Sequence, residues 1–180
     1  RSVSAKKLGR PEKWAGRRRS YARQEMRNGD NKRAYLIASK HFLSEGSDFA
    51  DLEWLSGYIA LRKLNDPAAA LRHFQRFRAA IATPISNGRA GYWQGRAYEA
   101  LGDKKNAKLA YQFGAQYQTS FYGQLAAEKI GASADASLAG REASPNWREA
   151  VFLGSTVFRA AILFHYADQS SSSERFLKHL

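Results

Sequence analysis

A short phrase recurs along this chain at nearly constant spacing, and this repeat constrains the fold more than any other feature. Its three copies begin at Gly29-Asp30, Asn65-Asp66 and Gly102-Asp103, so that successive aspartates lie 36 and 37 residues apart. A second phrase, Trp54-Leu55-Ser56-Gly57, returns 38 residues later as Tyr92-Trp93-Gln94-Gly95. A period in the mid-thirties is typical of stacked helical hairpins, because each hairpin is too small to bury its own apolar face.

Each residue of the first phrase suits the boundary between two helices. Gly29, Asn65 and Gly102 tolerate the left-handed backbone that follows the end of a helix. The aspartate after each of them accepts hydrogen bonds from the free N–H groups of the next helix. Pro67 suits the first helical position, where its missing N–H costs nothing. The alanine four residues after each aspartate lets the paired helix approach closely, so we predict three turns in register.

Apolar residues between these turns recur at helical spacing, and no segment alternates as a strand does. We expect Asp48 to cap the third helix. The expected helices of this region are residues 11–28, 31–43, 48–64, 67–82, 85–101, 104–117 and 120–130. The predicted fold is therefore all-α: a right-handed superhelical array of helical hairpins, that is, a tetratricopeptide-like α-solenoid.

The predicted domain boundary is the stretch 131–144, which is rich in Gly, Ala and Ser. After it we expect a helix that opens at Pro145 and runs through Phe164, a Ser-rich turn at 168–173, and a last helix from Glu174. The predicted organisation is a disordered basic leader at 1–14, a helical-repeat domain at 15–131 and a separate helical segment at 145–180.

Basic residues outnumber acidic ones, and they concentrate at the front of the chain. The formal net charge is +13, and residues 1–33 contain twelve Lys or Arg side chains against three acidic ones. Such a surface attracts polyanions such as nucleic acid, anionic lipid or the carboxylates of a cell-wall polymer. A solvated face plus a disordered leader explains the same pattern.

Residues that carry enzyme chemistry are sparse in this chain. The absence of Cys excludes disulfides, thiolate zinc sites and a cysteine nucleophile. The histidines do not have a metal-ligand spacing, so we interpret each as a partly buried helix residue. They are His41, His73, His165 and His179. We therefore expect no catalytic residue, no metal and no cofactor.

Two groups of side chains invite a functional interpretation but have a structural one as well. The carboxylates of Asp48, Asp51 and Glu53 suit a helix N-terminus, and Glu99 suits a cap or an ion pair with Arg96. The aromatic residues at repeat-equivalent positions would suit a sugar-stacking platform, but we interpret them as the core between helices. They are Trp54, Tyr58, Tyr92, Trp93 and Tyr98.

Several of these segments resemble the superhelical part of soluble lytic murein transglycosylases. The resemblance covers residues 15–131, and its most specific piece is Thr119-Ser120-Phe121-Tyr122-Gly123-Gln124-Leu125-Ala126. Residues 145–180 resemble the truncated start of the linker domain in that family. The other similar strings are Arg17-Arg18-Arg19-x-x-Ala22-Arg23, residues 53–62, 65–74 and 83–97, and Ala100-Leu101-Gly102-Asp103.

Members of that family are bacterial periplasmic enzymes that cleave the glycan strand of peptidoglycan and leave 1,6-anhydromuramic ends. The resemblance implies a curved array of helices that holds the strand for a separate lysozyme-like domain. That domain carries Glu followed by Ser and then a Gly-Leu-Met-Gln string, whereas Met26 is the only Met of this chain. The resemblance thus implies a non-catalytic module in the periplasm.

The partners that the resemblance implies are peptidoglycan glycan strands and the catalytic domain of the same parent chain. The candidate substrate contacts are Arg89, Arg96, Tyr122 and Gln124, for which packing and helix capping are the competing interpretation. A free-standing tetratricopeptide-like adaptor that binds an acidic protein partner is the alternative. We do not expect nucleic acid, because the chain has no recognised nucleic-acid motif. We also expect no transmembrane segment.

Overall fold

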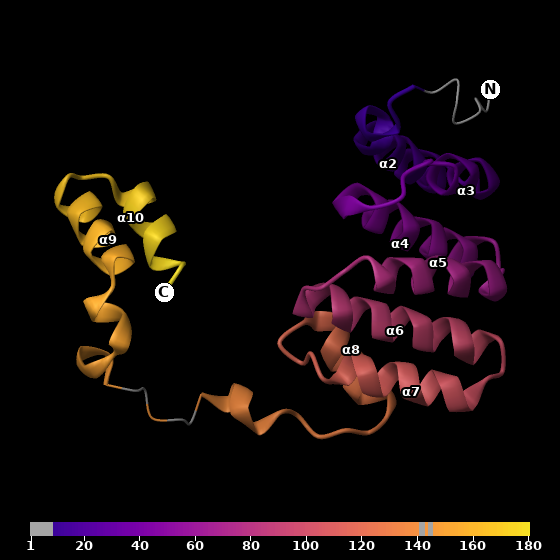
Figure 1. Cartoon of the computed structure of the whole chain (residues 1–180). Coiled ribbons are helices and arrows are strands. Elements are labelled where there is room, and N and C mark those ends of the chain that lie inside the picture. The colour runs from indigo at the N-terminus through magenta and orange to yellow at the C-terminus, as the bar shows by residue number, and fades with distance from the viewer. Residues whose placement is uncertain (1–8, 141–142, 144–145) are drawn as a thin grey trace. The chain divides into compact units, whose positions relative to one another are not determined.

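The computed structural model describes residues 9–140, 143 and 146–180. Within these residues every regular element is a helix and no strand is present, so the prediction of an all-α fold is confirmed. The chain divides into two compact units, Arg1–Leu138 and Ala139–Leu180, and the division falls within the stretch 131–144 (Figure 1). The 3₁₀ helix η1 (Ala136–Ala139) lies at this division.

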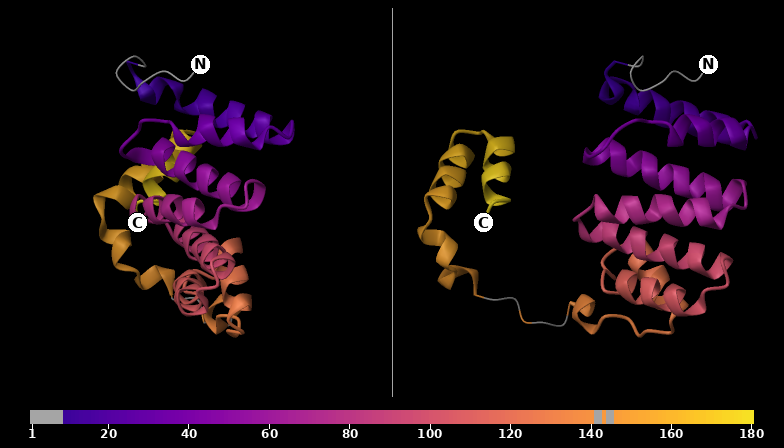
Figure 2. Two further views of the ribbon diagram at one scale, coloured as in Figure 1. Left: turned by 90° about the vertical axis from the view of Figure 1, so that its right-hand side faces the viewer. Right: turned by 45° about the vertical axis from the view of Figure 1, so that its right-hand side comes forward.

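Helices of the first unit contact one another in the order of the chain. Each packs against the next, and α2 also contacts α4 while α6 contacts α8. Figures 1 and 2 show these helices in successive layers. They are α2 (Pro11–Arg27), α3 (Asn31–Ser39), α4 (Gly46–Lys63), α5 (Pro67–Ala79), α6 (Pro84–Ala100), α7 (Lys104–Ala115) and α8 (Phe121–Lys129). The apolar side of each helix is therefore covered by helices that are near in sequence.

The three repeated phrases form the turns that the sequence predicts. Gly29, Asn65 and Gly102 have left-handed φ values of 89°, 53° and 77°. The side chain of the next residue accepts a hydrogen bond from the backbone N–H three residues later, at 3.0, 2.9 and 3.0 Å. These caps are Asp30, Asp66 and Asp103. The alanines that follow, Ala34, Ala70 and Ala107, are buried between helices.

The second phrase of the repeat places a glycine against an aromatic ring of the following helix. A Cβ atom on Gly57 would lie 2.6 Å from the Phe74 ring of α5, and one on Gly95 would overlap the Tyr111 ring of α7. Phe74 and Tyr111 are themselves 37 residues apart. The repeat in sequence is thus a repeated packing contact, which only glycine permits at this helix spacing.

Several details of the first unit differ from the prediction; α3, for example, ends at Ser39 rather than at residue 43. Helix α4 begins at Gly46 rather than at Asp48, and its N-cap residue Glu45 makes no side-chain cap. Asp48 lies within the first turn of α4, too far into the helix to be its N-cap. Its carboxylate instead pairs with Arg19 of α2. Helix α2 begins at Pro11, as the predicted helix 11–28 does, so residues 11–14 of the predicted leader are helical; residues 1–8 lie outside the described part.

The first predicted helix of the second unit is interrupted. The prediction of a single helix from Pro145 to Phe164 is wrong. Two 3₁₀ helices, η2 (Trp147–Glu149) and η3 (Val151–Gly154), precede α9 (Thr156–Tyr166). The break arises because Ser155 is extended and caps α9 through the N–H of Phe158. Pro145 itself lies outside the described residues.

The end of the second unit also differs from the prediction. Helix α10 (Ser170–Leu177) begins four residues before Glu174, so most of the predicted Ser-rich turn is helical. The turn is confined to the end of α9, where Asp168 has a φ of 56°. Helices α9 and α10 pack on each other through Phe164 and Phe176, whose ring centroids are 5.2 Å apart.

Candidate functional site

Arg89 of α6 lies between aromatic rings from two other helices. Its Cζ atom is 5.1 Å from the ring centroid of Trp54 on α4 and 5.7 Å from that of Tyr122 on α8. A guanidinium at these distances is attracted by the negative faces of the rings. We call Arg89, Trp54 and Tyr122, together with the adjoining Tyr92 and Trp93, the Arg89 cluster.

The charge of Arg89 has no counterion among the residues that the structure describes. No described carboxylate lies within ion-pair distance of its guanidinium. Its Nε atom is buried without a hydrogen-bond partner, and so are the indole Nε1 atoms of Trp54 and Trp93. All three atoms are hydrogen-bond donors. The Arg89 cluster therefore combines positive charge with unused donors.

Aromatic rings around Trp93 hold the Arg89 cluster together. The ring of Trp93 lies 5.5 Å from that of Tyr92, 6.1 Å from Tyr122 and 6.2 Å from Trp54, centroid to centroid. Tyr92 and Trp93 are buried in the core, as predicted for these repeat-equivalent aromatics. Trp54 and Tyr122 are half-buried and pack at the edge of the same core. The edge thus presents aromatic surface beside Arg89.

Arg96 joins this region through Tyr92, but its charge is partly compensated. Its Nη1 donates to the Tyr92 hydroxyl at 3.0 Å, and its Nε lies 3.3 Å from Oε2 of Glu99. Burial lowers the pKa of Arg96, but the bond to Tyr92 and the charge of Glu99 raise it overall. The predicted ion pair of Glu99 with Arg96 is confirmed, and Lys129 shares the same carboxylate at 3.2 Å.

Gln124 lies apart from the other three candidate residues. Its Nε2 donates to the backbone oxygen of Gln118 at 3.0 Å, in the turn that precedes α8. Both residues line a separate pocket of about 510 Å³ beside η1. The structure therefore brings Arg89 and Tyr122 together and links Arg96 to them through Tyr92, whereas Gln124 contributes to a different surface.

A buried ionic cluster around Glu53 is the feature that sequence reasoning missed. Glu53 is only 3% exposed. Its carboxylate accepts from His41 Nε2 at 3.1 Å, from His73 Nδ1 at 2.6 Å and from Arg76 Nε at 2.9 Å. Burial alone would raise the pKa of Glu53, but these hydrogen bonds lower it to about 2. Its interpretation as a helix-N-terminal carboxylate is therefore wrong.

The hydrogen-bond partners place a proton on the imidazole nitrogen that faces Glu53 in both histidines of the Glu53 cluster. His41 Nδ1 accepts from the N–H of Leu43 at 3.0 Å, so its proton lies on Nε2, toward Glu53. His73 Nε2 lies 2.9 Å from the Tyr35 hydroxyl, which can donate or accept in this contact, and burial raises the pKa of Tyr35. Two imidazole N–H groups and the Arg76 guanidinium thus face one anion, Glu53.

His73 Nδ1 has a second polar neighbour, which bears on this assignment. It lies 2.8 Å from Nη2 of Arg76, and a protonated nitrogen cannot accept there. We place the proton on Nδ1, toward Glu53, because a carboxylate at 2.6 Å is the stronger acceptor. His41 and His73 are more buried than the sequence predicts, and no spacing pattern reveals them because they come from separate segments.

The Glu53 carboxylate and both imidazoles are buried, whereas Arg76 is half-exposed, and the cluster joins α4 and α5 to the segment after α3. No three acidic or imidazole side chains of the described residues are arranged to hold a metal ion.

None of the helices in the described ranges is long and apolar enough to cross a membrane. In comparisons with known proteins, no family model, no curated protein and no solved structure matches this chain.

Proposed function

We propose that this chain is a non-catalytic helical-repeat module that binds the glycan strands of peptidoglycan. In this proposal helices α2 to α8 form a right-handed superhelical array, a tetratricopeptide-like α-solenoid. The module holds the strand for a lysozyme-like catalytic domain of the same parent chain, as in the soluble lytic murein transglycosylases that the sequence resembles. The compartment is then the periplasm.

The observation that carries this proposal is the guanidinium of Arg89 between Trp54 and Tyr122, without a counterion among the described residues. Peptidoglycan combines sugar rings with carboxylates on its stem peptides. A guanidinium binds a carboxylate through paired, charge-assisted hydrogen bonds. The neighbouring aromatic rings offer flat apolar surface to a sugar ring. The two chemical features of the polymer therefore have matching groups in one cluster.

The most specific string of the resemblance has a packing role that supports the proposal. The Ser120 hydroxyl accepts from the N–H of Gly123 at 3.1 Å and so caps α8. Its Oγ also fills the space beside Gly88 of α6, where no Cβ would fit. These contacts seat α8 against α6 and thereby place Tyr122 beside Arg89. The string thus positions the residues that we assign to binding.

Co-sedimentation of the chain with purified peptidoglycan sacculi tests the proposal. We expect Arg89→Ala to weaken binding about tenfold or more, since a charge-assisted contact contributes about 1.5–3 kcal/mol. Arg62→Ala is the matched control, because Arg62 is exposed on α4 and outside the Arg89 cluster. It removes the same charge and should change binding little.

The proposal is wrong if both variants lose binding equally, because the attraction would then be one of net charge alone. It is also wrong if the chain ignores sacculi but binds an acidic peptide with micromolar affinity, as the adaptor alternative expects. Purified cell walls incubated with the chain should stay turbid; clearing would contradict a non-catalytic role.

A further inference from the structure

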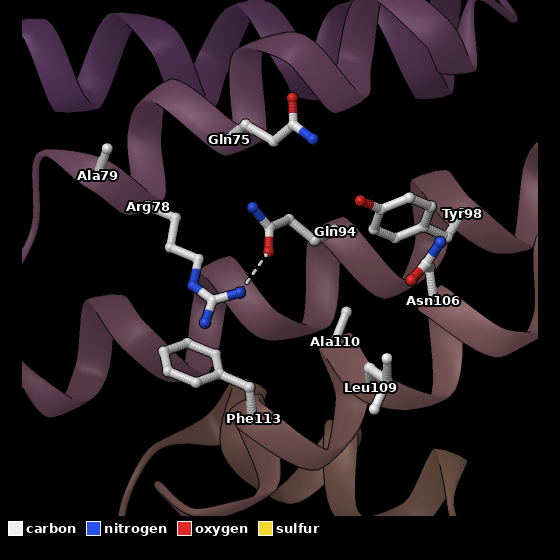
Figure 3. A pocket seen from close by; sticks show the side chains of 9 residues that line it. All are labelled: Gln75, Arg78, Ala79, Gln94, Tyr98, Asn106, Leu109, Ala110 and Phe113. Atoms are coloured by element: carbon white, nitrogen blue, oxygen red, sulfur yellow. Dashed lines mark hydrogen bonds between the residues drawn. The ribbon is translucent and has the colours of Figure 1, made fainter.

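A pocket on another surface of the first unit contains a fixed cation. It is about 590 Å³ in volume and lies between α5, α6 and α7 (Figure 3). It shares no residue with the Arg89 cluster. Arg78 is its only charged lining residue, and amide, phenol and apolar side chains surround it. The lining residues are Gln75, Arg78, Ala79, Gln94, Tyr98, Asn106, Leu109, Ala110 and Phe113.

The guanidinium of Arg78 is held in place from two sides. Its Cζ atom lies 3.6 Å from the ring centroid of Phe113, so the two planes are in close contact. Its Nη1 donates to Oε1 of Gln94 at 3.1 Å, as Figure 3 shows. Gln94 is only 4% exposed, and its Nε2 is held in turn by the backbone oxygen of Phe74 at 3.3 Å. The cation is therefore oriented before any ligand arrives.

The positive charge of Arg78 is not compensated within the described residues, since no described carboxylate pairs with it. Gln94 uses one N–H of the guanidinium, and the others are available to an anion. The amide of Asn106 donates to Asp103 at 2.6 Å, which leaves its carbonyl oxygen as an acceptor at the pocket. Gln75 supplies a second amide, with no hydrogen bond to described residues.

We propose that this pocket binds the terminal α-carboxylate of a short peptide. The carboxylate takes the free N–H groups of Arg78, and a peptide amide pairs with Gln75 and Asn106. The preceding apolar side chain lies on Leu109 and Phe113. The volume lies within the range of small-molecule sites and suits a ligand of two or three residues. This inference does not rest on the proposed glycan binding.

Such a carboxylate has two sources, which differ in configuration. The C-terminus of a protein consists of L-residues, whereas a peptidoglycan stem peptide ends in D-alanine. We therefore choose N-acetyl-L-Ala-L-Ala and N-acetyl-D-Ala-D-Ala as probes, each beside its C-terminal amide. Titration of the full chain is followed by NMR through the Arg78 Nε–H and the Gln94 side-chain amide, so that binding elsewhere on this basic chain is not mistaken for binding here.

The inference predicts that at least one free acid shifts both signals and that its amide binds about tenfold or more weakly. The configuration that binds identifies the source. Arg78→Ala should weaken the acid about tenfold or more, and Arg78→Lys should weaken it less, because it keeps the charge but loses the planar fork. Arg72→Ala is the matched control on α5, exposed and outside the pocket.

Three outcomes would overturn the inference: neither acid shifts the Arg78 and Gln94 signals, acid and amide bind equally, or Arg72→Ala weakens binding as much as Arg78→Ala. Acetate that binds as tightly as the dipeptides would also contradict it, because the amides and apolar residues would then contribute nothing. Failure of sacculus binding with retained dipeptide binding would refute only the glycan proposal.

Discussion

The two units of this chain both consist of helices, but they differ in how far their apolar side chains are buried. In the first unit, large side chains such as Phe74, Leu52 and Ile59 are fully buried between successive helices. In the second unit, Val151 is 95% exposed and Tyr166 81%. Its only buried residues, among those described, are Ala161 and Ser173.

This difference shows that helix signals and helix stability are separate properties. Ser155 caps α9 in the same way that Asp66 caps α5, so side-chain caps that favour the start of a helix are present in both units. Within the second unit itself, few residues cover the apolar side chains, such as Leu163, which is 70% exposed. Burial of apolar surface supplies most of the free energy of folding. We therefore expect the cooperative unfolding transition to report the first unit.

The largest expected effect comes from the buried carboxylate of the first unit. Glu53→Gln leaves the charge of Arg76 without its partner and turns an amide donor toward His41 or His73. Two buried imidazole N–H groups also lose their charged acceptor, which costs about 1–3 kcal/mol for each. Urea denaturation followed by circular dichroism at 222 nm measures the loss.

The matched change in the second unit is Glu174→Gln, which removes an exposed ion pair with Lys178. It should alter the free energy of unfolding by about 0.5 kcal/mol or less. Equal losses for the two variants would contradict the assignment of the stable core to the first unit.

Acid should weaken the first unit through the same carboxylate. The pKa of Glu53 is about 2 in the folded chain against 4.5 for the free side chain. A lowered folded-state pKa contributes stability above pH 4.5, and this contribution is lost as the pH falls from 4.5 toward 2. The shift corresponds to about 3 kcal/mol.

Comparing wild type with Glu53→Gln tests this contribution below pH 4.5, because the carboxylates that do not contact Glu53 are the same in both chains. The difference between their free energies of unfolding should shrink as the pH falls from 4.5 toward 2. A difference that does not depend on pH would show that the Glu53 carboxylate is not held by its three donors.

Close helix packing predicts the next effect. Gly95→Ala forces a methyl group into the ring of Tyr111, and overpacking of this kind costs about 1–3 kcal/mol. Gly154→Ala, in the second unit, meets no atom within 4 Å and should leave the unfolding midpoint unchanged within error. Thermal denaturation of both variants measures the contrast, and a neutral Gly95→Ala would exclude the close approach of α6 and α7.

The smallest contrast compares two helix caps. Asp66→Ala removes the acceptor of the Ala69 N–H and should lower the free energy of unfolding by about 1 kcal/mol. Ser155→Ala removes the equivalent contact in the second unit, where it should reduce helicity without moving the main urea midpoint. A midpoint that moves equally for both would mean that the units unfold together.

The features that the sequence predicts best are those fixed by local chemistry. The three turns at Gly29, Asn65 and Gly102 follow from conformational preferences and caps, and the structure has each of them. The Ser155 break depends on a single cap within a segment of helical spacing, and the early start of α10 escapes prediction because its N-cap residue, Gln169, makes no side-chain cap. The end of α3 at Ser39 precedes a left-handed Phe42, a conformation that its residue type does not suggest.

The candidate site was only partly predictable for a related reason. Arg89 and Tyr122 lie close together because α8 packs against α6. The repeat period predicts that equivalent positions of neighbouring hairpins lie near each other. Gln124 differs from Tyr122 by only two positions, yet the turn of the helix directs it to another pocket. The Glu53 cluster joins three segments, and only the fold reveals that His41 and His73 converge on one carboxylate.

Hydrogen exchange of the full chain, measured with and without peptidoglycan glycan strands, tests the central claim most directly. The account predicts that the strands slow exchange in the segments around Trp54, Arg89 and Tyr122 and leave residues 146–180 unchanged. Unchanged exchange around these three residues, or protection confined to the basic helix α2 or to the second unit, would contradict it.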